Sequence, residues 1–133
     1  MSEYLAPAIS PETQPYWDAA RRRQLAIPFC AKCNAWSWPP VGRCARCDSP
    51  NQWRAVSGEG VVETFSVVHR PPKKKGDHAE PYVLAFVMLN EGVRIFAAVA
   101  AADPASIVLR TPVTVDFHPI ADSDLLLPVF MPR

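Results

Sequence analysis

The sequence lacks a long hydrophobic run, a signal peptide and an excess of charge of either sign. No segment approaches the roughly 20 consecutive apolar residues that a membrane-spanning helix needs. Residues 1–10 contain Glu3 and no continuous apolar stretch, so they do not resemble a secretory signal. The 14 basic and 13 acidic residues give a net charge of +1, which argues against a general binder of polyanions. We therefore expect a cytoplasmic protein that binds neither membranes nor nucleic acid.

The familiar sequence motifs of catalysis are also missing. There is no nucleophile elbow, phosphate-binding loop, dinucleotide fingerprint or pair of carboxylates at a catalytic spacing. His69, His78 and His118 are scattered, and no sequence neighbour marks any of them as a catalytic base. We predict no catalytic residue in this chain, so that any enzyme chemistry connected with it takes place in another protein.

All four cysteines, in contrast, lie within one short segment. Cys30 and Cys33 form a first CxxC pair, and Cys44 and Cys47 form a second pair after ten intervening residues. Two such pairs at this separation are a strong signal for a tetrahedral metal site. Two disulfides are the alternative, which the absence of a secretory signal disfavours.

The predicted metal is zinc in a structural role. Four thiolates suit zinc or iron, and four protein ligands leave no position open for a substrate. Asn34 and Asp48 follow the two pairs, and both residue types tolerate the left-handed backbone that such turns need. The residues between the pairs are too few to build a core, so the metal would stabilise this segment. An electron carrier of the rubredoxin type, with iron in the site, is the alternative.

The rest of the chain divides around this segment. Apolar residues make up 49% of the sequence, which is typical of a folded globular protein. The 15 prolines argue against long helices. We predict an N-terminal helical segment at residues 1–26, a zinc ribbon at 27–52 and an OB-fold domain at 53–133.

A helix is predicted ahead of the ribbon. Ser10 would be its N-cap, with Pro11 at the first helical position. The helix would extend to about Leu25, with the arginines at positions 21–23 near its C-terminal end, where cations complement the helix dipole. Pro28 would then separate the helix from the first cysteine pair.

Beyond the ribbon the pattern predicts strands separated by turns. Val61, Phe65 and Val67 would share one face of the longest strand. A short helix capped by Asp103 would precede the penultimate strand, and a small Greek-key barrel of the OB type fits this arrangement. The predicted strands cover residues 53–56, 61–69, 82–89, 93–100, 113–117 and 125–131.

The predicted hairpin at residues 82–100 is apolar on both faces. Its loop is Asn90-Glu91-Gly92, and large apolar residues such as Phe86 and Phe96 alternate with others that are equally apolar. A small barrel has one interior face to fill. The other face must therefore be covered by the N-terminal helix, by the ribbon or by another protein chain.

Nearly the full chain resembles a known family. The resemblance depends on the four-cysteine ribbon together with residues 16–22, 57–62, 65–70, 81–85 and 128–130. These motifs are similar to those of the acyl-CoA-associated OB-fold proteins with a rubredoxin-like zinc ribbon, long known as a domain of unknown function. Members often have glycine near Arg23 and near Arg110, and this chain has none at either place.

The resemblance implies a mainly β protein with an N-terminal helix, a rubredoxin-like zinc ribbon and a five-stranded OB-fold barrel. It also implies a non-catalytic accessory subunit of a thiolase-like complex, with a thiolase or an aldolase as partner, that helps to bind acyl-CoA in lipid or steroid metabolism. A binder of single-stranded nucleic acid is the alternative, because OB barrels and zinc ribbons both serve that role.

An acyl-CoA ligand would need cationic groups, because CoA carries a 3′-phosphate and a diphosphate. Arg21, Arg22 and Arg70 are our candidates for these phosphates. Trp17 would stack or pack beside the adenine, and His69 would contact the pantetheine arm.

Overall fold

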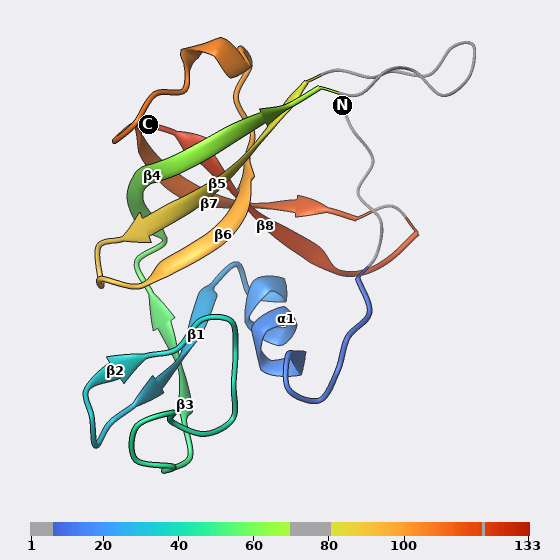
Figure 1. Cartoon of the computed structure of the whole chain (residues 1–133). Coiled ribbons are helices and arrows are strands. Elements are labelled where there is room, and N and C mark those ends of the chain that lie inside the picture. The colour runs from blue at the N-terminus through green and yellow to red at the C-terminus, as the bar shows by residue number, and fades with distance from the viewer. Residues whose placement is uncertain (1–6, 70–80, 121) are drawn as a thin grey trace.

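The computed structural model describes residues 7–69, 81–120 and 122–133. A helix and a small sheet come first in the chain, and a barrel follows them (Figure 1). No helix in the described residues is long and apolar enough to cross a membrane. The elements in chain order are α1 (Gln14–Arg21), β1 (Leu25–Cys30), β2 (Ala35–Trp36), β3 (Gln52–Val56), β4 (Glu59–Val68), β5 (Tyr82–Leu89), β6 (Arg94–Val99), the 3-10 helix η1 (Pro104–Ser106), β7 (Pro112–Pro119) and β8 (Leu126–Pro132).

The last five strands close into a barrel in the order β4-β5-β6-β8-β7. All neighbours are antiparallel except β6 and β8, which pair in parallel at Val99 and Phe130. Inward-facing residues such as Val62, Val87 and Phe130 are fully buried in its core. A five-stranded Greek-key barrel of this kind is an OB fold, so the predicted fold class is confirmed.

The N-terminal helix starts later than predicted. Ser10 and Thr13 instead fix the turn ahead of it, because each hydroxyl accepts a hydrogen bond from the other's backbone N–H, at 3.3 and 3.1 Å. The N-cap of α1 is therefore Thr13 and not Ser10. The carbonyl of Ser10 still accepts a bond from the N–H of Gln14, so Ser10 opens the turn that leads into the helix.

The helix also ends before its predicted limit, at Arg21. The N–H of Arg23 bonds to the carbonyl of Ala20, and the N–H of Gln24 bonds to the carbonyl of Ala19. This is the Schellman pattern, which requires a left-handed residue after the cap. Arg23 adopts that conformation, with a φ of 59°, and so terminates the helix.

Strand β1 occupies residues that we predicted to be helix end and linker. All of its residues are buried, because β1 is the central strand of the sheet β2-β1-β3 and packs against α1. Its pairing with β3 runs from Leu25 opposite Val56 to Phe29 opposite Gln52. A short apolar run is equally compatible with a buried strand and with a helix, which explains the error.

Two glycines shape the start of β4. Gly58 has a φ of +76°, and a Cβ there would collide with Val115. A Cβ at Gly60 would collide with the carbonyl oxygen of Met88 on the paired strand. Neither position has room for a side chain, so β4 can pair closely with both β5 and β7.

A bulge follows in the same strand. The register between β4 and β5 shifts between Val62 and Thr64. Val62 is therefore buried in the barrel core, against which Phe65 and Val67 also pack. Val61, which we predicted on that face, is only half-buried, because simple alternation cannot reveal the extra residue of a bulge.

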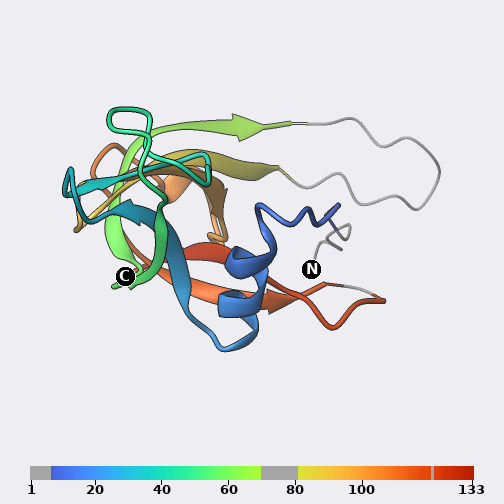
Figure 2. The same ribbon diagram turned by 90° about the horizontal axis from the view of Figure 1, so that it is seen from below.

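Helix α1 connects the small sheet to the barrel. It packs against β1 on one side and β8 on the other, as the view from below shows (Figure 2). Trp17 is buried with Ile120 and Leu125. The ring of Tyr16 packs against those of Trp17 and Trp38, with ring centroids 5.1 and 5.4 Å apart. The ribbon and the barrel are therefore packed on a common element.

Candidate functional site

The four predicted ligands come together in the ribbon. Cys30 is the last residue of β1 and Cys33 lies in the turn that leads to β2, whereas Cys44 and Cys47 lie in the long connection to β3. Their four Sγ atoms all lie within 4.8 Å of one another, and those of Cys30 and Cys47 are 3.6 Å apart. Within the described residues this is the one group of side chains placed to hold a metal.

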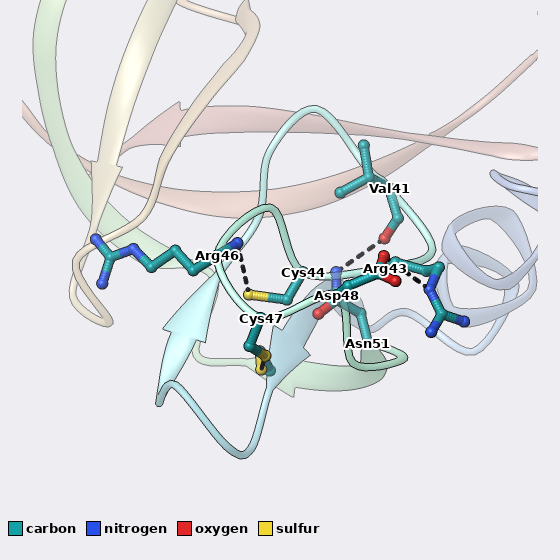
Figure 3. A network of polar contacts seen from close by, with 8 residues as sticks. Val41, Arg43, Cys44, Arg46, Cys47, Asp48 and Asn51 are labelled. Atoms are coloured by element: carbon teal, nitrogen blue, oxygen red, sulfur yellow. Dashed lines mark hydrogen bonds and ion pairs between the residues drawn. The ribbon is translucent and has the colours of Figure 1, made fainter.

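Backbone geometry aims each pair at a common point. Asn34 and Asp48, the residues after the two pairs, have φ values of 54° and 60°. The left-handed conformation predicted for both is thus confirmed. The N–H of Cys33 donates to the sulfur of Cys30 at 3.3 Å. The N–H of Arg46 donates to the sulfur of Cys44 at 3.4 Å (Figure 3). Such donors stabilise thiolates, which are the form that binds metal.

The pKa values of the thiols differ because each sulfur has different hydrogen-bond partners. Hydrogen bonds from Ser49 lower the pKa of Cys47 to about 6, and the N–H groups of Cys47 and Arg46 lower the pKa of Cys44. The hydrogen bond with the sulfur of Cys47 raises the pKa of Cys33 to about 12. Four clustered sulfurs cannot all ionise without a cation, so the site fits a thiophilic divalent ion such as zinc.

The loop around the second pair is supported by polar contacts. Arg43 and Asp48 form an ion pair at 3.0 Å, and the side-chain amide of Asn51 donates to the carbonyl of Val41 at 3.0 Å (Figure 3). The N–H of Cys44 bonds to the carbonyl of Ser49. Zinc would close this segment with Cys30, Cys33, Cys44 and Cys47, and its contribution there would be structural.

A second feature is a groove between the ribbon and the barrel. Its volume is about 840 Å³, and one wall comes from the ribbon while the other is the outer face of the β5–β6 hairpin. Phe86 and Phe96 stand on that outer face, 39% and 50% exposed, with ring centroids 5.0 Å apart. The groove is lined by Asn34, Ala35, Trp36, Trp38, Pro39, Phe86, Met88, Glu91, Gly92, Val93, Arg94 and Phe96.

The sequence predicted only one side of this groove. The sequence showed that both faces of the hairpin are apolar, which is more apolar surface than the interior of one small barrel can bury. In the structure the ribbon leaves the outer face partly exposed. The opposing tryptophans lie within the segment predicted as the zinc ribbon, residues 27–52. No local pattern places Trp36 and Trp38 opposite the hairpin, since that contact depends on how the two sheets pack.

The proposed acyl-CoA residues are not gathered at one place. Trp17 is only 8% exposed, so little of its ring is open to a ligand. Arg21 and Arg22 are exposed at the end of α1, and Arg21 forms an ion pair with Asp124 at 3.3 Å. His69 follows β4, whose end lies away from α1 in both views (Figures 1 and 2). Arg70 lies outside the described residues.

Comparison with families of known sequence agrees with this architecture. Residues 17–52 match the family described as the rubredoxin-like zinc ribbon domain of ChsH2. Residues 53–118 match the C-terminal OB-fold domain of ChsH2. The chain is also 32% identical to a DUF35 domain-containing scaffold protein of Methanocaldococcus jannaschii, over 80% of this chain and 77% of the relative.

Other relatives are longer or occur in assemblies. The chain is 37% identical to a probable enoyl-CoA hydratase alpha subunit of Thermomonospora curvata, over 95% of this chain but only 39% of the relative's length. A solved structure of the Ltp2-ChsH2(DUF35) aldolase contains a chain that superposes with a TM-score of 0.82 at 35% identity. That match covers 96% of this chain and 98% of the other.

Proposed function

Because this chain belongs to the DUF35 family of OB-fold proteins with a zinc ribbon, we propose that it is an accessory subunit of a thiolase-like complex. The complex would act on acyl-CoA thioesters, with a thiolase or an aldolase as the catalytic partner. This chain would supply no catalytic residue and would contribute to the binding of acyl-CoA.

The observation that carries this proposal is the likeness to the chain in the Ltp2-ChsH2(DUF35) aldolase. The likeness extends over almost the whole of both chains, at an identity that goes beyond a shared fold. The name of the archaeal relative, a scaffold protein, also supports a role in assembly. The hydratase subunit is more than twice as long as this chain, so its name does not indicate a hydratase activity for this chain.

The structure adds physical support for a partner. A site with four thiolate ligands has no open position for a substrate, so its metal would hold the ribbon and not catalyse a reaction. The outer face of the hairpin exposes Phe86 and Phe96 side by side. Adjacent exposed aromatic residues are typical of protein–protein interfaces.

The acyl-CoA part of the proposal rests on charge. Arg21 and Arg22 are exposed and adjacent at the end of α1, where they would bind CoA phosphates. Arg70 is proposed as a further phosphate contact. His69 is proposed at the pantetheine arm, and Trp17 would support the helix that presents the arginines. We expect weak CoA affinity for the isolated chain, because the partner would supply the rest of the site.

Complex formation tests the proposal. The chain is expressed together with the thiolase-like or aldolase protein encoded beside it in its source genome, and the eluate is analysed by size-exclusion chromatography with light scattering. We expect a single species that contains both chains at a fixed ratio. Separate elution of the two proteins at micromolar concentration would count against an accessory subunit.

A further inference from the structure

The aromatic side chains that line the groove between ribbon and hairpin are held in place by contacts within this chain. On the ribbon side, Trp36 packs against Phe29 with centroids 4.6 Å apart. Trp38 is held in a similar way by Tyr16 from α1, and on the hairpin side Phe86 and Phe96 support each other. A binding surface whose side chains are already ordered loses little conformational entropy when it is occupied.

Among the described residues that line it, the groove has no free cation and one unpaired carboxylate. Arg94 forms an ion pair with Glu63 at 2.6 Å, and its guanidinium lies 5.8 Å from the centre of the Phe86 ring. The carboxylate of Glu91 accepts hydrogen bonds from the N–H and hydroxyl of Ser57 at 2.7 and 3.2 Å, and these neutral donors leave its negative charge in place. An acidic occupant would therefore be repelled by Glu91 and would find no free cation among the lining residues.

We propose that this groove is the docking site for one extended segment of the partner subunit that contains proline or aliphatic residues and no acidic residue. The inference rests on the proposed function and adds to it the surface used and the chemistry of what binds there. Aromatic-lined grooves favour extended proline-containing segments, because their rings pack on the aromatic faces and their backbone is already restricted. A volume of about 840 Å³ accommodates a short segment and not a whole domain surface.

A charge placed in the groove provides the test. Phe96→Glu adds a carboxylate to the outer face of the hairpin without touching the barrel core, since Phe96 is half-exposed. Leu109→Glu is the matched control, because Leu109 is 62% exposed and is not among the lining residues of the groove. Phe96→Tyr keeps the aromatic ring. Melting temperature and zinc content are measured for each variant to show that it is folded.

Affinity for the co-encoded thiolase-like protein is then measured by titration calorimetry. We expect Phe96→Glu to weaken binding roughly thirtyfold or more, as at an interface hot spot, while Phe96→Tyr and Leu109→Glu bind like the original chain. If folded Phe96→Glu binds as tightly as the original chain, the groove is not the docking site, although the proposed function stands. If the original chain itself does not bind, the proposed function fails as well.

The identity of the occupant is tested separately. A photocrosslinking phenylalanine analogue replaces Phe96, and the crosslinked peptide is sequenced by mass spectrometry. We expect a peptide of the partner subunit that has no acidic residue at the crosslink and contains proline or aliphatic residues. A crosslink to a second copy of this chain, or to an acidic segment of the partner, would overturn the proposal.

Discussion

The carboxylate of Glu91 accepts two hydrogen bonds from Ser57, one from its backbone N–H at 2.7 Å and one from its hydroxyl at 3.2 Å. Ser57 lies between β3 and β4, where the chain leaves the small sheet and enters the barrel. Glu91 lies in the loop of the β5–β6 hairpin. This contact therefore ties the hairpin tip, beside the groove, to the connection between the small sheet and the barrel.

Removal of this contact has a measurable cost. We expect Glu91→Ala to lower the free energy of unfolding by about 1 kcal/mol, which is less than the roughly 1.5–3 kcal/mol typical of hydrogen bonds to a charged group, because the contact is exposed. Glu91→Gln keeps one acceptor oxygen, so its free energy of unfolding should fall by less. Urea denaturation followed by tryptophan fluorescence measures both. Identical midpoints for Glu91→Ala and the original chain would show that the contact does not stabilise the fold.

The metal site predicts a local effect of metal loss. We expect one zinc per chain by elemental analysis. In Cys44→Ser we expect faster hydrogen exchange at residues 31–51, with β5 and β6 still protected. Leu25 and Ile27 of β1 belong to the same buried cluster as the barrel residues, so this part of the first sheet should stay folded. Iron in place of zinc, or exchange that is raised equally throughout the barrel, would contradict this prediction.

Two arginines occupy positions with a left-handed backbone, near which the family resemblance leads us to expect glycine. Arg23 and Arg110 have φ values of 59° and 69°, a region that is unfavourable for residues with a Cβ. We expect Arg23→Gly to stabilise the protein by roughly 0.5–1 kcal/mol, net of the entropy that glycine adds to the unfolded chain. Arg22 has a φ of −89°, so Arg22→Gly serves as the control and should be destabilising. A lower melting temperature for Arg23→Gly would contradict this.

Local signals in the sequence were sufficient for much of the fold. The spacing of Cys30, Cys33, Cys44 and Cys47 predicted a metal site whose sulfurs the structure brings together. The Asn90-Glu91-Gly92 loop predicted the β5–β6 hairpin, and Gly92 indeed has a φ of 88°. These features depend on contacts between residues close in sequence, which pattern analysis detects.

Errors arose where contacts distant in sequence decide the structure. Leu25 belongs to a strand because it pairs with Val56, and the residues around Leu25 do not reveal this. The sequence also did not reveal that Trp17 packs against Ile120 and Leu125, which lie in the connection between β7 and β8. The groove was missed for the same reason, since its walls come from two separate sheets.

The role proposed for the arginines at the end of α1 can be separated from their effect on stability. We expect the double variant Arg21→Ala, Arg22→Ala to raise the KM for acyl-CoA in the reconstituted complex more than it lowers kcat, because it removes phosphate contacts made equally in the ground and transition states. Asp124→Ala breaks the ion pair with Arg21 but keeps both arginines. If Asp124→Ala raises KM as much as the double arginine variant does, the effect is due to the lost ion pair and not to lost phosphate contacts.

The most direct test of the proposed role is the rate of acyl-CoA turnover by the co-encoded thiolase-like protein, measured with and without this chain. We predict that this chain alone has no carbon–carbon cleavage activity and that its addition at a stoichiometric ratio raises turnover by the partner. Equal turnover in the presence and absence of this chain, with no complex formed, would contradict the role of accessory subunit.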